Sequence, residues 1–307
     1  MAVPRITGAL LCAGALTAAL PAQDRPARFQ SGVDLISVTA SVVDRDGHPV
    51  TGLPRDAFEI FENGERQVIA QFTNERVPVS LVVLLDVSDS MFGQRLVDAR
   101  AAVERFLFDL LDEEDEFSVV AFNHEPIVLT GWTQAPSVVT RAMGPLRPSG
   151  ATALYDAILT ALPMMNTRAR QRAAVLIISD GADTASDAGL RDVRAALVRS
   201  DAFVYAIGID PPARRAINET VNVTALNEIT GGSGGKTEVV HEPAGLLAAT
   251  ARIAEELNSQ YVLGYHSPQP PDGKYRTIRV RAANPDYRVR ARRGYIAEAR
   301  NPATPSR

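Results

Sequence analysis

The amino-acid sequence predicts an α/β fold, a doubly wound and mostly parallel sheet inserted into a discontinuous antiparallel β-sandwich. Over residues 78–258, short apolar runs alternate with segments of helical periodicity. Strand patterns without helices flank this block at residues 32–77 and 259–297. Neither flank is long enough to close a core alone, so we expect the two flanks to pair and form one sandwich domain.

Each flank carries three strand patterns separated by turn residues. Asp-Gly and Asn-Gly pairs predict turns in the first flank, at Asp46-Gly47 and Asn63-Gly64. The expected strands cover residues 33–44, 57–63, 66–73, 260–266, 277–282 and 287–292. Alternation along the last two strands predicts that most of their arginines face solvent. Residues 298–307 are expected to form a disordered tail.

The central block predicts a parallel sheet with helices on both faces. Its first strand, Ser80–Leu85, is a continuous apolar run that ends at Asp86, as expected for a strand buried on both faces. Further strands are expected at residues 117–122, 127–129, 174–178, 203–209 and 236–240, and helices at 94–111, 152–165, 190–198, 225–229 and 244–258. Ligands of such sheets bind beyond the carboxyl ends of the strands.

Charge and cysteine content exclude several classes of function. The chain has 32 Lys and Arg residues against 36 Asp and Glu residues, and its formal net charge is −4. Such a balance provides no excess of positive charge for electrostatic binding of nucleic acid. The only cysteine, Cys12, lies in a segment that we expect to be removed. The mature chain therefore has no disulfide, thiolate nucleophile or cysteine-ligated zinc.

Residues 1–22 have the pattern of a secretory signal peptide. Arg5 precedes an apolar stretch from Ile6 to Leu20, and small residues lead to a cleavage point near Ala22. The alternative is a membrane anchor, but a spanning helix needs about 20 apolar residues, more than this stretch provides. We therefore expect a secreted or periplasmic protein with no integral membrane segment after cleavage.

Carboxylates and hydroxyls of three segments are expected at one edge of the sheet. The first segment follows the strand at 80–85, the second is a Gly-containing loop that opens a helix, and the third ends the strand at 174–178. Their oxygen-bearing side chains are those of Asp86, Ser88, Ser90, Thr152 and Asp180. Such a set suits a hard cation, Mg²⁺ above all, with Mn²⁺ or Ca²⁺ as alternatives. A plainer interpretation is that Asp86 and Ser88 only cap a helix N-terminus.

The order D-x-S-x-S, a Thr in a Gly-containing loop, and S-D-G resembles the von Willebrand factor type A domain over residues 78–258. The flanking segments look like a secreted bacterial subgroup of related proteins. In this family the motif residues form the metal-ion-dependent adhesion site. The resemblance implies that Ser88, Ser90 and Thr152 contact the metal through oxygen. It also implies that Asp86 and Asp180 bind the metal directly or through water.

The resemblance implies a binding function and no enzymatic activity. Two carboxylates roughly neutralise Mg²⁺ and the hydroxyls add no charge, so the cation can accept a carboxylate oxygen from an Asp or Glu of a protein partner. Family members mostly bind proteins in this way, sometimes with movement of the last helix, here residues 244–258. Two alternatives stay open: a structural module with an inactive metal site, and a metal-assisted hydrolase.

Several neighbouring features have plainer interpretations. Gly231–Gly235 matches the G-x-S-x-G pattern of hydrolases, but a helix pattern precedes it and a strand pattern follows, the reverse of the required context. A role of His124 as general base beside Asp86 is disfavoured against a solvated loop side chain. Asp183 could tune the charge of the site or cap the following helix, and we favour capping. The polar insertion at 210–221 could shape partner choice.

Overall fold

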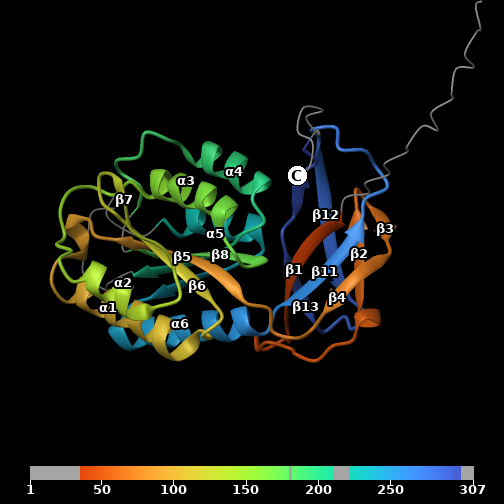
Figure 1. Ribbon diagram of the computed structural model, residues 1–307, viewed down its shortest axis with the longest axis horizontal. Coiled ribbons are helices and arrows are strands. Elements are labelled where there is room, and N and C mark those ends of the chain that lie inside the picture. Colours follow the sequence, from red (N-terminus) through yellow and green to blue (C-terminus); the bar gives the residue numbers. More distant parts are fainter. Residues whose placement is uncertain (1–34, 180–181, 210–221, 299–307) are drawn as a thin grey trace, which may run out of the picture. The chain divides into compact units, whose positions relative to one another are not determined.

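A six-stranded sheet forms the centre of the α/β region, in the strand order β10-β9-β8-β5-β6-β7 (Figure 1). The computed structural model describes residues 35–179, 182–209 and 222–298. The strands of this sheet are β5 (Val79–Asp86), β6 (Glu116–Phe122), β7 (Pro126–Thr133), β8 (Arg172–Ser179), β9 (Phe203–Ile209) and β10 (Thr237–Val240). Neighbouring strands pair in parallel, except that β7 runs antiparallel to β6 at the edge. The predicted mostly parallel sheet is therefore confirmed.

Helices cover both faces of this sheet (Figure 1). Successive side chains of the buried strands point to opposite faces, and they form one apolar core with the helices on each face. Along β5, Leu81 and Val83 belong to the first core, and Val82 and Leu84 belong to the second. The first core is closed by α1 (Gln94–Arg105), α2 (Pro136–Met143) and α6 (Pro243–Asn258). The second core is closed by α3 (Leu154–Met164), α4 (Leu190–Arg199) and α5 (Val223–Ser233). Every residue of β5 is buried, as expected for a central parallel strand.

Two helices on the first face differ from the expectation. α2 has no counterpart among the predicted helices, because it is short and begins at Pro136, whose missing N–H is tolerated at a first helical position. The helix predicted at 94–111 ends at Arg105 and continues as a π-helical turn, η3 (Phe106–Leu110).

The helix predicted at 225–229 is longer in both directions. The Asn222 side chain accepts a hydrogen bond from the first turn and starts α5. Gly234, with φ of +99°, ends the helix in the left-handed conformation. A Cβ at Gly235 would lie 2.0 Å from the carbonyl oxygen of Val204. The glycine run therefore ends a helix and lets it pack closely on β9.

The two flanks together form two four-stranded antiparallel sheets, in the orders β13-β1-β11-β4 and β14-β12-β2-β3. The strands are β1 (Leu35–Val43), β2 (Phe58–Glu62), β3 (Glu65–Gln67), β4 (Ile69–Thr73), β11 (Tyr261–His266), β12 (Tyr275–Ala282), β13 (Arg288–Ala291) and β14 (Gly294–Ile296). Each sheet contains strands of both flanks; β1, for example, lies between β11 and β13. The expected pairing of the flanks is confirmed, whereas the domain boundaries stay a prediction.

Details of the sandwich depart from the predicted pattern. The strand predicted at 66–73 divides at Val68, which is 84% exposed, because β3 and β4 belong to different sheets. The Asp46-Gly47 turn forms, but it leads to an isolated bridge between Val43 and Pro49 and not to a hairpin of two strands.

The arginines of β12 divide between the two faces of the sheet. Arg279 and Arg281 are exposed, as the alternation predicts. Arg276 points to the buried face, where its Nη1 lies 3.6 Å from Oε1 of Glu62 and 2.6 Å from the hydroxyl of Ser267. An interior arginine is tolerated here because a carboxylate and hydroxyls surround it.

The expected signal peptide at 1–22, the insertion at 210–221 and nearly all of the expected tail lie outside the described residues. In residues 35–179, 182–209 and 222–298, no helix combines the length and the apolar character needed to cross a membrane.

A buried carboxylate joins the sandwich to the α/β region where α6 leads into β11. Glu256 is 1% exposed and accepts hydrogen bonds from the hydroxyls of Ser41 and Tyr205, each at 3.0 Å. Arg290 of β13 donates to the other carboxylate oxygen, and Nζ of Lys236 lies 3.4 Å from it. Two cations and two hydroxyls from both regions therefore offset the desolvation of this charge.

Replacement of Glu256 by alanine is expected to lower the free energy of unfolding by about 3 kcal/mol, because it leaves Arg290 and Lys236 without their shared carboxylate. Denaturant unfolding measures the change. Glu255→Ala is the matched control, since Glu255 is exposed on the same helix and its replacement should change the value by less than about 0.5 kcal/mol. Equal effects of the two substitutions would contradict the role of Glu256.

Candidate metal centre

The candidate site lies where the strand order of the sheet reverses. From β5 the chain proceeds to β6 and β7 on one side, and it then returns to β8 on the other side of β5. Loops that leave the carboxyl ends of β5 and β8 therefore diverge, which is the usual place of a ligand in an open α/β sheet. Leu85 pairs with Ile178, so Asp86 and Ser179 are neighbours at this point.

Asp86 ends β5 with no exposure to solvent. Its Oδ1 accepts a hydrogen bond from the backbone N–H of Ser88 at 2.8 Å, and its Oδ2 accepts one from the hydroxyl of Ser179 at 2.5 Å. Both carboxylate oxygens are thus oriented, one by the loop that follows β5 and the other by β8. A buried carboxylate needs such donors or a cation to offset its desolvation.

Ser88 and Ser90 lie in the first turn after β5. The short 3₁₀ helix η2 (Asp89–Met91) folds Ser90 back beside Ser88, and their hydroxyl oxygens are 2.9 Å apart. Arg95 of α1 donates to the carbonyl oxygen of Ser90 and holds the end of this turn. Asp89, between the two serines, is exposed, as expected for the variable position of the motif.

Two backbone hydrogen bonds join the Gly-containing loop before α3 to the loop after β5. Ser149 N–H donates to the carbonyl oxygen of Val87, and Asp89 N–H donates to that of Gly150, both at 2.9 Å. Gly150 has φ of +76°, and a Cβ there would lie 3.0 Å from Nδ1 of His124. The backbone conformation of this position therefore favours glycine.

The residues after β6 support the same loop. Asn123 donates from its side-chain amide to the hydroxyl of Ser149 at 3.1 Å, and its carbonyl oxygen accepts the N–H of Ala153. His124 is exposed and lies 3.9 Å from the carboxylate of Glu125. Within the described part of the chain His124 makes no hydrogen bond to a site residue, which fits the interpretation as a solvated side chain.

Thr152 is 5% exposed and is held by the segment that follows β8. Its backbone N–H donates to the hydroxyl of Thr184 at 3.0 Å. Its carbonyl oxygen accepts hydrogen bonds from the backbone N–H groups of Thr184 and Ala185, at 2.8 and 3.1 Å. These bonds use the backbone of Thr152, so they fix its position without engaging its hydroxyl.

Asp183 caps α3 and not the helix that follows it, so the predicted role is right and the predicted helix is wrong. Oδ1 of Asp183 accepts a hydrogen bond from the backbone N–H of Tyr155 at 3.1 Å and one from the hydroxyl of Ser186 at 2.5 Å. Ala153, at the N-cap of α3, has no side-chain oxygen to serve this purpose. A segment distant in the sequence therefore supplies the acceptor.

Asp180 lies outside the described residues, directly after Ser179. For the other predicted site residues, hydrogen bonds bring Asp86, Ser88 and Ser90 together, and backbone bonds join the loop before Thr152 to them. Their donors are carboxylate and hydroxyl oxygens, which fit a hard cation such as Mg²⁺.

Three further residues position the site: Ser179 orients Asp86, Asn123 supports the Gly-containing loop, and Thr184 holds Thr152. Their partners are 93, 26 and 32 positions away in the sequence, so local patterns could not identify them. For Ser179 alone the sequence offered an indication, because this serine is the first residue of the S-D-G motif and precedes the predicted ligand Asp180.

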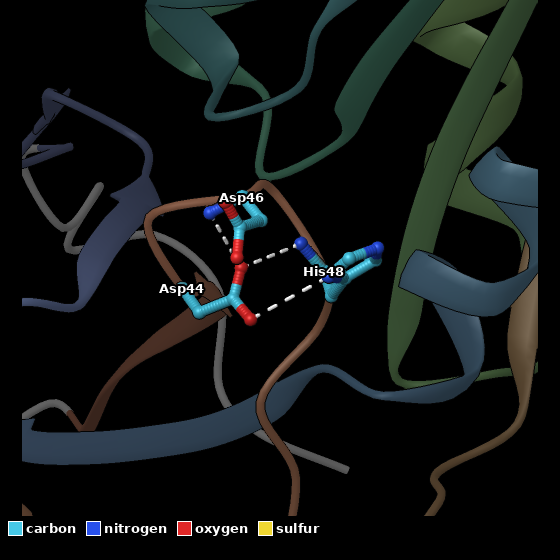
Figure 2. Close-up of side chains that lie close together, drawn as sticks. All are labelled: Asp44, Asp46 and His48. Carbon is cyan, nitrogen blue, oxygen red and sulfur yellow. Dashed lines mark hydrogen bonds and ion pairs between the residues drawn. The ribbon is translucent and has the colours of Figure 1, made fainter.

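A second group of potential ligands, Asp44, Asp46 and His48, lies in the turn after β1 (Figure 2). Oδ1 of Asp44 accepts the backbone N–H groups of Asp46 and His48, both at 2.9 Å, and Oδ2 lies 3.6 Å from Nδ1 of His48. The backbone hydrogen bond from His48 is the largest cause of the lowered pKa of Asp44. Turn formation accounts for the arrangement of these three residues.

Asp183→Ala is expected to lower the free energy of unfolding by about 1 kcal/mol, because α3 loses the acceptor for its first turn. Thermal or denaturant unfolding measures this loss. Asp187→Ala is the matched control: Asp187 is exposed in the same segment, and among the described residues its backbone N–H is bonded to Asp156 while its carboxylate makes no bond. A loss of the same size in both variants would contradict capping by Asp183.

Residues 81–182 match the family model of the von Willebrand factor type A domain. Inter-alpha-trypsin inhibitor heavy chain H2 of Mesocricetus auratus is 25% identical over 167 residues, which cover 49% of this chain and 17% of that protein. An uncharacterized protein of Synechocystis is 25% identical over 162 residues, which cover 51% of this chain and 38% of that protein. The chain therefore matches well under two thirds of the length of these relatives.

Among solved structures, a von Willebrand factor type A protein from Catenulispora acidiphila is similar with a TM-score of 0.53 and 14% identity. The similarity covers 88% of this chain and 75% of that chain, and at this identity it concerns the fold alone. The matched range 81–182 includes all five predicted site residues. The sequence motif, the strand order and the family-model match agree that residues 81–182 are similar to the von Willebrand factor type A domain.

Proposed function

We propose that the protein is a metal-dependent protein-interaction module without enzymatic activity. In this proposal Mg²⁺, or Mn²⁺ or Ca²⁺ in its place, is held by oxygen atoms of Asp86, Ser88, Ser90, Thr152 and Asp180. An open position on the cation accepts an Asp or Glu carboxylate of a protein partner. The main support is the buried, oriented carboxylate of Asp86 beside two hydroxyl oxygens 2.9 Å apart.

The charge balance of this ligand set favours recognition. Two carboxylates offset a divalent cation and the hydroxyls add no charge, so the bound cation keeps its attraction for another carboxylate. Hydrolysis would also need a base that activates water. His124, the candidate considered from the sequence, lies against Gly150 and beside Glu125, which does not single it out for this task.

The surface beside the site suits a protein partner. Phe92 directly follows η2 and is 79% exposed, an unusual state for a phenylalanine ring. A cavity of about 150 Å³ lies between the N-terminal ends of α1 and α6, with Arg95 and Leu246 among its lining residues. Exposed aromatic rings and shallow apolar cavities are features of protein interfaces. In this proposal the protein is secreted or periplasmic, so this surface is available to partners outside the inner membrane.

Calorimetric titration of Mg²⁺ into the metal-free protein tests the metal site. The wild-type protein is expected to bind about one equivalent, and Asp86→Asn to bind none, because a charged ligand is replaced by a neutral one of the same shape. Asp89→Asn removes the same charge from an exposed position of the same turn, and it should leave the affinity within about twofold.

Equal affinities of the wild-type protein and Asp86→Asn would overturn the ligand set. Absence of binding by the wild-type protein to Mg²⁺, Mn²⁺ and Ca²⁺ alike would favour the structural module with an inactive site.

Acetate tests the carboxylate-accepting position. When Mn²⁺ occupies the site, its unpaired electrons are expected to broaden the methyl proton resonance of acetate, which can coordinate the ion. Acetamide has nearly the same shape and no charge, so its resonance should broaden much less. Asp86→Asn controls for free Mn²⁺.

Equal broadening of acetate and acetamide, with the metal fully bound, would contradict carboxylate recognition and leave the metal site standing. Chelator-sensitive turnover of ester or phosphate substrates would instead support the hydrolase.

A further inference from the structure

A cavity of about 510 Å³ lies away from the candidate metal centre, between α4 and α5 on one side and strands β12 and β14 on the other. Its volume is in the usual range for sites that enclose small molecules. The lining residues that matter below are Arg194, Leu197, Val198, Tyr275, Arg292 and Arg293.

Arginines dominate the charge of this cavity. Arg194 is paired with Glu228, which also lines the cavity, at 2.5 Å. Arg292 and Arg293 form the connection between β13 and β14, and they have no acidic partner within 4.0 Å among the described residues. The cavity therefore presents two guanidinium groups that have no paired carboxylate, although Asp201 attracts Arg292 at longer range. Guanidinium groups recognise planar carboxylates through paired hydrogen bonds.

Arg292 is fixed and partly desolvated. One of its Nη atoms donates to the carbonyl oxygen of Ser37 at 2.7 Å, and its guanidinium lies 5.5 Å from the centre of the Tyr295 ring. Its Nε is buried and finds no hydrogen-bond partner in the described part of the chain. Burial lowers the pKa of Arg292. A cation in this state gains more from a bound anion than one in open water, because less solvent screens the pair.

Arg293 has a fixed backbone and an unengaged guanidinium. Its N–H donates to the carbonyl oxygen of Gly232 at 3.3 Å, and its own carbonyl oxygen accepts from Ile278 N–H at 2.8 Å and from the Tyr275 hydroxyl at 3.2 Å. No hydrogen bond or ion pair of its guanidinium occurs within residues 35–179, 182–209 and 222–298. A ligand would therefore meet an exposed guanidinium on a fixed backbone, with its donors available.

One part of the cavity wall is apolar, whereas Thr224 and Asn227 line another part. Leu197 and Val198 lie in the C-terminal part of α4, and Tyr275 is 47% exposed although its hydroxyl is bonded. An aromatic face and two aliphatic side chains opposite arginines suit a molecule with one charged end and one apolar body.

We propose that this cavity binds a small organic carboxylate, with Arg292 and Arg293 at the carboxylate and Tyr275, Leu197 and Val198 against its apolar body. The site is built from residues other than those of the metal centre, so it does not depend on the proposed adhesion function.

Titration of phenylacetate into the full chain, followed by amide proton–nitrogen shifts, tests the proposal. Saturable shifts are expected in the C-terminal half of α4 and around Gly294. Arg293→Gln should weaken binding at least about tenfold, because one guanidinium is lost. Arg199→Gln is the matched control, an exposed arginine of α4 outside the cavity lining, and it should leave the affinity unchanged. Asp86→Asn should leave it unchanged as well.

Three results would overturn the proposal. The first is the absence of saturable binding by phenylacetate, benzoate and cyclohexanecarboxylate. The second is binding that Arg293→Gln and Arg292→Gln leave unchanged in proteins with wild-type unfolding transitions. The third is equal binding of neutral phenylacetamide, or stronger binding of inorganic phosphate, since either would remove the need for a carboxylate on an apolar body.

Discussion

The carboxylate of Asp86 limits which groups can lie next to it, because it has no solvent access and ends a fully buried strand. A charge in this position is tolerated only if donors or a cation surround it. The strand order provides such neighbours, because β8 returns beside β5 and brings the Ser179 hydroxyl to one carboxylate oxygen. The loop after β5 turns back to offer Ser88 N–H to the other oxygen. Topology and electrostatics therefore select the same point for a ligand.

Glu256 shows how the protein treats a buried carboxylate that has a structural role. Arg290 and Lys236 neutralise it, and hydroxyls from the sandwich and the α/β region complete its contacts. At Asp86, by contrast, a backbone N–H and a hydroxyl donate to the two carboxylate oxygens. Glu256 belongs to an ion-pair network between the sandwich and the α/β region, whereas Asp86 lies at the carboxyl end of β5, where ligands of open α/β sheets bind.

The sequence predicted what depends on local pattern. Buried strands such as β5 are continuous apolar runs. The order of strand and helix patterns was sufficient to predict the mostly parallel sheet and the pairing of the two flanks. Local pattern failed where long-range contacts decide. α3 takes its cap from Asp183, and Arg276 turns inward to Glu62. Ser179 was adjacent to a predicted ligand, yet its role became visible only when β8 lay beside β5.

α4 leads from the candidate metal centre to the arginine cavity. It begins after the segment that holds Thr152, and Leu197 and Val198 near its C-terminal end line the cavity. A helix of 10 residues is about 15 Å long, whereas the Debye length at physiological ionic strength is about 8 Å. Charges bound at the two places are therefore largely screened from each other by solvent. Coupling between them would require a second packing of Val193 and Leu197 in the core beneath α4, since only a two-state element carries such an effect. With these side chains packed as they are, we expect the two proposed sites to bind their ligands independently.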